Sequence, residues 1–300
     1  MDPLSDVLHL LSAKSYITSG LTAPDTWGLH FPGFDGLKFF AVQKGKARFR
    51  TDEQTEWHTL QQGDGIILTR LQGFDLTTPG SEVSGESEET PYVLCDGIAN
   101  YGGEALMMIA GKMEIDRSAA DILLNELPPV IFISSGSDEA SVFSWLMNYI
   151  RSEKLFPKPG SDIVTDHLMH LMMIEGIRSW LSRSDSSHQG WSSALRDHRI
   201  MTVLSAIHHE PSRNWRLPEF AEMAGMSRAG FVRRFCQLTG STPLNYLTDW
   251  RMRLASKALR SSQTPVGQIG FSLGYGSESA FSTAFKRVYG CSPLEHRRQA

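Results

Sequence analysis

The sequence predicts an α+β protein in two parts. A small antiparallel β-sandwich or barrel followed by helices comes first, and an all-α domain with two helix-turn-helix motifs joined by a linker helix comes last. Three observations predict this fold: short apolar runs separated by turn residues over residues 26–113, helix-periodic runs after residue 139, and a pattern of Phe, Phe, Gly and Pro that occurs twice near the C-terminus.

Length and composition set the outer limits. The chain has 300 residues, of which 41% are hydrophobic, enough for two packed domains and too many for a disordered chain. No apolar run reaches the roughly eighteen residues of a membrane span, and the start, MDPLSDVLHLLSAKS, lacks a basic segment followed by an apolar one. We therefore expect a cytoplasmic protein with no membrane partner. The three cysteines, Cys95, Cys236 and Cys291, are far apart and odd in number, which favours reduced thiols over disulfides.

The strands are expected in the first third of the chain. Five short runs rich in β-branched and aromatic residues are separated by Gly, Asp and Pro, which is typical of an antiparallel sandwich or small barrel. They are LKFFAVQ, KARFR, GDGIILT, PYVLCDGIA and EALMMIA. The acidic segment SEVSGESEET, Ser81 to Thr90, has no periodicity, so we expect an exposed loop there.

Two helices are expected next, over residues 140–154 and 162–183, with Ser161 or Asp162 as the cap of the second. The second helix is apolar over more than one face, which predicts contact with another subunit as well as with its own core, although a fully buried core helix explains the pattern equally well. The residues concerned are Leu168, Met169, Leu171, Met172, Met173 and Ile174. The Ser-rich stretch Ser182 to Gly190 is the expected linker.

The repeated pattern is FVRRFCQLTGSTP, Phe231 to Pro243, and FSTAFKRVYGCSP, Phe281 to Pro293. A pair of small residues four positions apart precedes each copy, which is what a helix-turn-helix needs: one small residue for close helix crossing and one Gly for the turn. Ser227 and Ser277 are the expected helix caps, and each Phe pair at i, i+4 is expected to be buried. The small residues are Ala221 with Gly225 and Gly270 with Gly274, and Gly240 and Gly290 are the expected C-caps.

A continuous helix is expected between the two motifs, over Thr242 to Ser261, with Pro243 in its first turn. Its length of roughly 27 Å, at about 1.5 Å per residue, suits two reading helices in neighbouring major grooves roughly 34 Å apart. The distribution of charge along the chain is consistent with a polyanion partner of the C-terminal part. Residues 191–300 contain 15 Lys and Arg and 7 Asp and Glu, whereas residues 1–190 contain 14 Lys and Arg and 26 Asp and Glu. Solvated surface arginines are the alternative explanation.

Residues 195–298 resemble the DNA-binding domain of the AraC/XylS family of transcription regulators, through the run GYGSESAFSTAFKRVYGCSPLEHRR. The N-terminal part is similar to the cupin-type effector domain of one branch of that family, through WGLHFPG, LQQGDGIIL, VLCDG and LLNELPPVIFI. The resemblance implies a cupin-like sensor and dimerisation domain over 1–183, a linker over 184–194 and a DNA-binding domain over 195–300. Within the last, it implies motifs at about 217–238 and 266–289 and a linker helix at about 243–260.

By the same resemblance, exposed residues early in each second helix face base edges. A guanidinium can bind guanine bidentately, a carboxylate can accept from cytosine N4, and small apolar groups can touch a thymine methyl. The base-reading candidates are Arg228, Ala229, Val232, Arg233, Glu278, Ser279, Ser282 and Thr283. The phosphate-contacting candidates are Arg234, Arg251, Arg253, Lys286 and Arg287. A solvated surface side chain is the alternative for any single Arg, and Glu278 could simply be a first-turn acid that favours the helix dipole.

The N-terminal half does not show the metal-binding residues of many cupins. His30 and His58 are isolated, and His167 and His170 lie on one helix face, so we expect no metal and no cofactor. Cys95, in VLCDG, matches a position where this branch carries a Cys, but no second Cys lies in that half, and we favour a buried strand residue over an oxidant sensor. A small-molecule pocket could be lined by Trp27, Phe31, Phe39, Phe40 and Phe49, although such aromatics are more often core.

These features together predict a sequence-specific DNA-binding transcription regulator, an activator as is usual in the family, and not an enzyme. The expected partners are double-stranded DNA, RNA polymerase, a second copy of the chain and an unknown small-molecule or oxidant effector. The main alternative is a metal-dependent cupin enzyme with an appended DNA-binding module. A DNA-repair methyl acceptor would need a zinc-thiolate site that Cys95 lacks partners to form, and a structural adaptor would show no salt-sensitive DNA binding.

Overall fold

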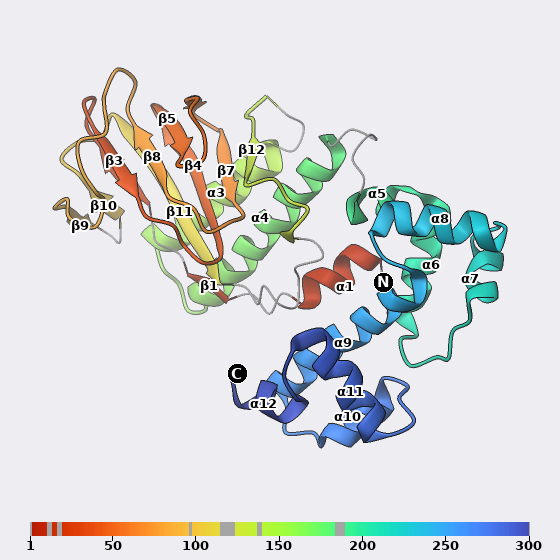
Figure 1. Cartoon of the computed structure of the whole chain (residues 1–300). Helices are drawn as coiled ribbons and strands as arrows, with labels where there is room; N and C mark the ends of the chain where they lie inside the picture. The colour runs from red at the N-terminus through yellow and green to blue at the C-terminus, as the bar shows by residue number, and fades with distance from the viewer. Residues whose placement is uncertain are drawn as a thin grey trace. The chain divides into compact units, whose positions relative to one another are not determined.

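A computed structural model of the chain describes residues 2–10, 14–16, 20–95, 98–114, 124–136, 140–183 and 190–299. The chain forms two compact units (Figure 1). The β unit comprises Ala13–Ile115 and Leu127–Ser184, and the helical unit comprises Met1–Ser12, Asp116–Glu126 and Asp185–Ala300. The first twelve residues therefore group with the C-terminal domain, whereas the sequence alone placed them in the N-terminal one. Most of the expected linker, residues 184–189, lies outside the described residues.

Two sheets build the β unit, in agreement with the predicted β-rich N-terminal domain. The larger sheet is ordered β12-β7-β4-β11-β2-β10-β9, with β1 also paired to β11; the smaller is ordered β3-β8-β5-β6. All pairs are antiparallel except β10 with β2. The strands are β1 (Lys14–Tyr16), β2 (Leu21–Ala23), β3 (Gly28–Phe31), β4 (Leu37–Lys44), β5 (Lys46–Thr51), β6 (His58–Gln61), β7 (Gly65–Leu68), β8 (Phe74–Thr77), β9 (Val93–Cys95), β10 (Ile98–Asn100), β11 (Leu106–Glu114) and β12 (Val130–Ile133).

The core of the β unit lies between the two sheets. Because side chains alternate along a strand, Phe40 and Val42 of β4 belong to one inter-sheet core, together with Met108 and Ala110 of β11. Phe74 of β8 is central: its ring centroid lies 4.9–5.7 Å from those of Phe31, Phe40 and Phe49. This aromatic cluster joins the smaller sheet to the larger one.

Helices α3 (Ala140–Leu155) and α4 (Ser161–Arg183) cover the other face of the larger sheet (Figure 1). A Cβ on Gly176 of α4 would lie 2.1 Å from Ile67 Cδ1 of β7, so this glycine permits a close approach of helix and sheet. The apolar residues Leu168, Met169, Met172 and Met173 of α4 are all buried within the chain's own core. The buried core helix, one of the two alternatives that the sequence left open, is therefore the better description of most of α4.

The acidic segment 81–90 is a loop, as expected, and Ser81 is its one buried residue. The segment lies beside β3: the backbone N–H of His30 donates to the carbonyl oxygen of Gly85, and the N–H groups of Ser84 and Ser87 donate to the carbonyl oxygens of Gly28 and His30. The segment thereby satisfies the backbone groups along the free edge of β3. The sequence did not predict that this segment pairs with β3, because backbone hydrogen bonds need no particular side chains.

The helical unit is all-α and contains both predicted helix-turn-helix motifs. The first motif consists of α7 (Leu217–Met223) and α8 (Arg228–Thr239), the linker helix is α9 (Pro243–Ser261), and the second motif consists of α10 (Val266–Ser272) and α11 (Glu278–Tyr289). The remaining helices are α1 (Pro3–Leu10), α5 (Trp191–Arg196), α6 (His198–His209) and α12 (Pro293–Arg298).

The repeated residues act as expected within each motif. Phe231, Phe235, Phe281 and Phe285 are fully buried, and Gly225 and Gly274 have φ values of 61° and 87° at the turns. A Cβ on Gly270 would lie 2.8 Å from Phe281 Cγ, so a larger residue would push α10 and α11 apart. The caps of the two motifs are also as predicted: Ser227 and Ser277 accept backbone N–H groups of their helices, and Gly240 and Gly290 end α8 and α11 in the left-handed conformation. Thr242 caps α9 in the same way.

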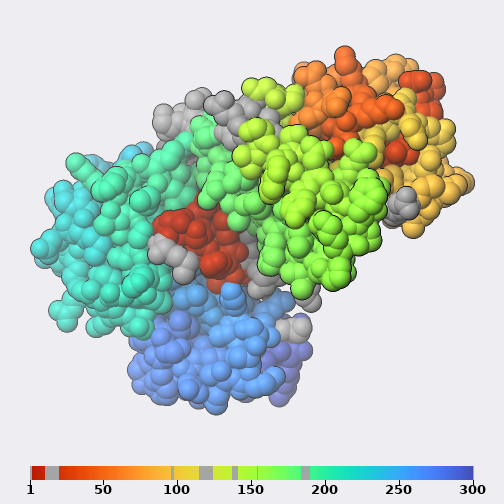
Figure 2. All heavy atoms as spheres, turned by 180° about the vertical axis from the view of Figure 1, so that it is seen from behind, coloured from red at the N-terminus to blue at the C-terminus, as the bar shows by residue number. Residues whose placement is uncertain are grey.

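Helix α1 packs against α6 and α9, and in Figure 2 its red atoms lie among those of the C-terminal helices. Val7 and Leu10 are buried there, and Lys257 Nζ of α9 donates to the carbonyl oxygen of His9 at 2.5 Å. Val7 and Leu10 lie three positions apart on one side of α1 and provide its docking face for the helical unit. This packing explains why residues 1–12 belong to that unit.

A buried hydrogen-bond chain crosses the centre of the helical unit. Trp191 Nε1 of α5 donates to the Tyr246 hydroxyl at 2.9 Å, and that hydroxyl donates to His208 Nε2 at 2.9 Å. The His208 ring also stacks on Trp250, with centroids 3.6 Å apart. The proton of the neutral imidazole is therefore on Nδ1, which lies 3.4 Å from the Asp6 carboxylate of α1. One histidine thus contacts α9 and α1 at once.

Burial lowers the pKa of His208 to about 3. Since histidine in an unfolded chain has a pKa of about 6.5, the unfolded state takes up a proton first as the pH falls. The contribution of neutral His208 is therefore fully present above pH 6.5 and declines below it, by about 2 kcal/mol at pH 5. We expect urea unfolding of the full chain to show this loss, and His208→Gln to reduce it.

The control is the adjacent exposed residue, His209, whose replacement by Gln should leave the pH dependence unchanged. An equal pH dependence in wild type and in H208Q would show that His208 does not titrate on unfolding as described.

Candidate DNA-binding interface and N-terminal cavity

The start of α8 presents an exposed, basic surface. Ser227 caps the helix through its bond from the Gly230 N–H at 3.2 Å, which leaves the first turn pointing outward. Arg228, Ala229 and Arg233 are exposed and Val232 is half-buried, while Phe231 and Phe235 on the opposite side anchor the helix. The candidate base-reading residues of the first motif therefore share the outer face, free of the core.

Arg234 lies on the same helix, but its side chain pairs with a carboxylate of the protein itself. Its Nε donates to Asp197 Oδ2 at 2.8 Å, and Asp197 also caps α6 by accepting the N–H groups of Arg199 and Ile200. Burial pushes the pKa of Asp197 upward, but the hydrogen bonds from Arg234 and the backbone outweigh it, so the pKa lies below its usual value. This geometry favours a role in attaching α8 to α6 over the phosphate contact expected from sequence.

The second recognition helix, α11, presents a less basic surface. Ser279 and Thr283 are exposed and Ser282 is half-buried. Glu278 is exposed as well, but its carboxylate turns towards α10: a Cβ on Gly267 would lie 2.6 Å from Glu278 Oε2. The carboxylate therefore lies near the N-terminal turn of α10, where the helix dipole favours it. Base contact would require Glu278 to leave this position.

Arg251 on the linker helix also forms hydrogen bonds within the protein. Its Nε donates to the carbonyl of Pro211 at 2.6 Å, and its Nη2 donates to that of Arg213 at 2.9 Å. Burial lowers the pKa of the guanidinium, and the group lies 5.7 Å from the ring centroid of Tyr275. Arg251 thus fixes the segment before α7 to α9, and its contact with phosphate stays a prediction. The two carbonyls could not be identified from sequence because they are about 40 residues away.

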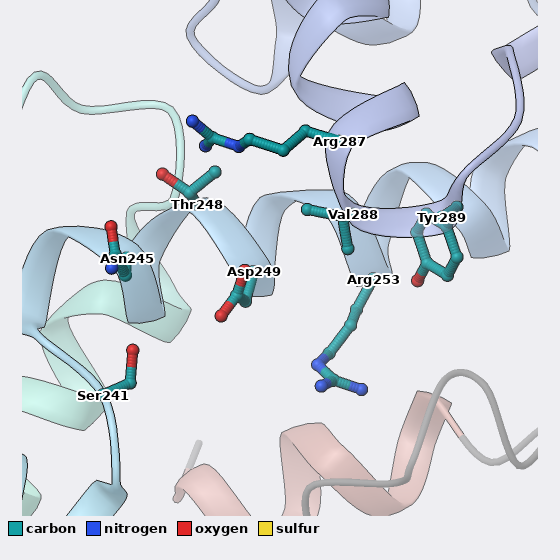
Figure 3. A pocket seen from close by; sticks show the side chains of 8 residues that line it. All are labelled: Ser241, Asn245, Thr248, Asp249, Arg253, Arg287, Val288 and Tyr289. Carbon is teal, nitrogen blue, oxygen red and sulfur yellow. The ribbon is translucent and has the colours of Figure 1, made fainter.

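A cavity of about 730 Å³ lies beside the linker helix in the helical unit. Ser241, Asn245, Thr248, Asp249 and Arg253 line it from the α9 side, and Arg287, Val288 and Tyr289 line it from the end of α11 (Figure 3). In Figure 3 the Arg287 side chain extends over α9 towards Thr248. The structure therefore brings together two of the phosphate-contacting candidates, Arg253 and Arg287, beside Asp249. Lys286 remains exposed on α11.

The five aromatic residues proposed for an N-terminal pocket separate into two groups. Phe31 and Phe40 line a cavity of about 430 Å³ in the β unit, whereas Trp27, Phe39 and Phe49 are buried and do not line it. Two lysines missed by the sequence reasoning, Lys38 and Lys112, also line the cavity. A signal for them was present: each continues the inward-facing alternation of its strand, where an apolar residue was expected.

Cys95 is exposed at the end of β9, which corrects the prediction that it is buried in a strand. β9 lies at the edge of the larger sheet, and all three of its residues are exposed. Among the described residues, no group of three or more His, Cys, Asp and Glu side chains is placed to hold a metal ion. His30 instead pairs with Asp75 at 2.9 Å, and His58 lies against the ring of Phe132.

Known proteins match the chain along its whole length. Residues 2–182 match the cupin family, and residues 220–299 match the helix-turn-helix domain family. A Streptomyces antibioticus protein named as an AraC-like transcription regulator is 35% identical over 299 residues, which is 99% of each chain. The chain belongs to the AraC-like transcription regulators.

Other members of this family are similarly close. A helix-turn-helix transcriptional regulator of Haemophilus influenzae is 37% identical to this AraC-like regulator over 304 residues, 99% of each chain. The DNA-binding domain of AdpA, crystallised with a target DNA, is 33% identical and covers 34% of this chain and 90% of its own, with a TM-score of 0.32. Both of these full-length relatives are named as transcription regulators. Within the part of the regulator that the structure describes, none of the helices is both long and apolar enough to cross a membrane.

Substituting Arg233 tests the base-reading surface. Because Arg233 is exposed on the outer face of α8, we expect R233A to cost about 1–3 kcal/mol on the preferred site and to relax base preference at one position. Lys286→Ala should weaken binding to all sequences equally and reduce the salt dependence by about one counterion. Fluorescence anisotropy over a set of single-base variants and salt concentrations measures both effects.

Gln237→Ala is the matched control, since Gln237 is exposed on α8 but nearly three turns after the cap, at about 3.6 residues per turn. Sequence-independent losses of equal size for R233A and K286A would contradict the assignment of Arg233 as a base reader.

Proposed function

We propose that this regulator is a sequence-specific transcription activator that binds DNA as a dimer and is controlled by a signal received in the β unit. One observation carries the DNA-reading part: two outward-facing recognition helices, α8 and α11, are attached to the two ends of one helix of 19 residues. At about 1.5 Å per residue, α9 is roughly 28 Å long. That length suits two helices that enter successive major grooves.

The two recognition helices differ in the residues that they expose. The first turns of α8 carry Arg228 and Arg233, whereas α11 carries Glu278, Ser279 and Thr283. Guanidinium groups favour guanine, whereas hydroxyl groups accept more than one base. The proposed DNA site for one subunit is therefore asymmetric, with a more strictly read half beneath α8.

Contact with RNA polymerase and an activating effect are proposed from the family resemblance. The signal is proposed to be a small molecule, and the cavity lined by Phe31 and Phe40 supports this choice. An oxidant acting on Cys95 is the second candidate. The exposure of that thiol favours it, since oxidation requires access.

Genome-wide binding combined with transcript measurement tests the proposal. Chromatin immunoprecipitation of the tagged full chain should recover a small set of promoters that share an asymmetric site. Transcripts from those promoters should fall when the gene is deleted and should not recover with the R233A variant. Enrichment without a shared sequence would contradict specific binding, and transcripts that rise on deletion would contradict activation.

An exposed apolar stripe on α3 supports the proposed dimer. Val142, Trp145 and Tyr149 are 41%, 57% and 39% exposed and lie at i, i+3 and i+7, on one side of the helix. The rings of Trp145 and Tyr149 contact each other at 5.5 Å. Aromatic residues are enriched at protein interfaces, so we propose that a second copy of the chain covers this stripe.

Trp145→Lys tests this dimer. A charge at the centre of a buried apolar interface is expected to weaken self-association at least about tenfold. Analytical ultracentrifugation of the full chain measures the change, and Ser144→Lys provides the control because Ser144 is exposed on another side of α3. A monomeric wild type, or an unchanged dimer in W145K, would contradict the proposal.

A further inference from the structure

Lys38 occupies a position where the fold otherwise places apolar residues. On β4, Lys38 alternates with Phe40 and Val42, which belong to the inter-sheet core. Only 8% of Lys38 is exposed. Its Nζ lies 4.6 Å from the ring centroid of Phe74 and within 5.4 Å of those of Phe31 and Phe40. An ammonium group is therefore held in an aromatic surrounding with little access to water.

A second lysine lies directly opposite. In the antiparallel register of β4 and β11, Lys38 pairs with Lys112, and both line the cavity of about 430 Å³. Like charges directly opposite each other destabilise a sheet. Among the described residues, neither lysine has a carboxylate within 4.0 Å or a hydrogen-bond partner for its amine. Burial, with a smaller contribution from Lys112, lowers the pKa of Lys38 to about 8.

Glu88 at the same wall offsets only one of the two lysine charges, and no carboxylate of the described residues pairs with either amine, so these observations call for a further negative charge. Buried ammonium groups in proteins are normally paired, because an unpaired one loses its hydration without compensation. The lysine stems could carry both amines towards solvent, but that would not account for two lysines opposite each other at one cavity wall. An anion between them would offset both the repulsion between the two ammonium groups and the free-energy cost of their desolvation.

The other residues that line the cavity indicate what the uncharged part of the ligand is made of. Apart from the lysines, the lining is largely apolar and aromatic, and the volume is typical of small-molecule sites. The aromatic lining residues are Phe31, Phe34, Phe40, Tyr92 and Tyr101. Glu88, exposed at the same wall, adds one negative charge, so the two lysines and Glu88 together carry a net charge of about +1. A single negative charge on an apolar body matches this surrounding better than a dianion.

We propose that the cavity of the β unit binds a monocarboxylate with an apolar or aromatic body, whose carboxylate lies between Lys38 and Lys112. This inference rests on the proposal that the β unit receives a small-molecule signal, and it identifies the chemical class of that signal. The cavity wall includes Gly20 and Leu21, and β1, which precedes them, pairs Tyr16 with Lys112. The bound carboxylate would thus lie beside the strand that follows α1 in the sequence.

Calorimetric titration of the full chain tests the ligand class. The probes are 3-phenylpropanoate and hexanoate, the neutral amides of both, and inorganic phosphate. We expect both carboxylates to bind at millimolar concentration or below, the amides to bind at least about tenfold more weakly, and phosphate, which lacks an apolar body, to bind no better than the amides. Equal binding of acid and amide, or no binding of either carboxylate, would overturn the proposal.

Variants locate the site. Lys38→Met should weaken carboxylate binding at least about tenfold and leave amide binding unchanged, because Met keeps the length and removes the charge. Lys112→Met should act in the same direction and carries the test if K38M does not fold, as judged by circular dichroism. Lys44→Met is the matched control, since Lys44 is on the same strand but exposed outside the cavity. Wild-type carboxylate affinity in a folded K38M or K112M would overturn the assignment.

The pH dependence provides a further readout. The titratable groups facing Lys38 are Lys112 of β11, Glu88, Tyr92 and Tyr101. Since the ligand needs protonated Lys38, its affinity should fall about tenfold between pH 7 and pH 9, and this fall should be absent from K38M. An affinity that is constant over this range in the wild type would contradict pairing with Lys38. DNA binding, measured on the same samples, tests the regulator function separately, because failure of either measurement leaves the other interpretable.

Discussion

The buried hydroxyl group of Tyr246 is the interaction on which the helical unit depends. It accepts a hydrogen bond from Trp191 of α5 and donates one to His208 of α6, and the ring of His208 lies on Trp250, one turn further along α9. Two helices, α5 and α6, are thereby fixed to the linker helix at a buried point. The orientation of the first recognition helix relative to α9 follows from this packing.

A second constraint acts within each helix-turn-helix. Phe281 packs so closely on Gly270 that no side chain fits between α10 and α11, and the buried pair Phe231 and Phe235 anchors α8 in the first motif. The repeated Phe and Gly residues therefore determine how each recognition helix is held, and they leave the outer face free to vary. The outer residues Arg233 and Thr283 differ between motifs because packing places no demand on them.

The β unit differs from the helical unit, because two charged side chains lie on a strand face that otherwise holds apolar core residues. Strand alternation assigns Lys38 and Lys112 to the inter-sheet interior, where the neighbouring positions hold Phe40 and Ala110. Stability alone would favour apolar residues at both positions. A fold that retains two opposed lysines beside a cavity is consistent with a ligand-binding role for the β unit, and the same cavity includes part of the aromatic set that the sequence had suggested.

The sequence by itself determined the two-part fold, the repeated motif, its caps and the length of the linker helix, because periodicity, capping and glycine turns are local properties of the chain. It also identified the outward residues Arg228 and Arg233, since helix spacing separates them from the buried Phe pair. Only the tertiary structure showed which arginines form hydrogen bonds within the protein: Arg234 binds Asp197, and Arg251 binds carbonyl groups that are distant in the sequence. The same holds for the docking of α1, the exposure of Cys95 and the pairing of Lys38 with Lys112. Each of these depends on residues that are far apart in the chain and meet only after folding.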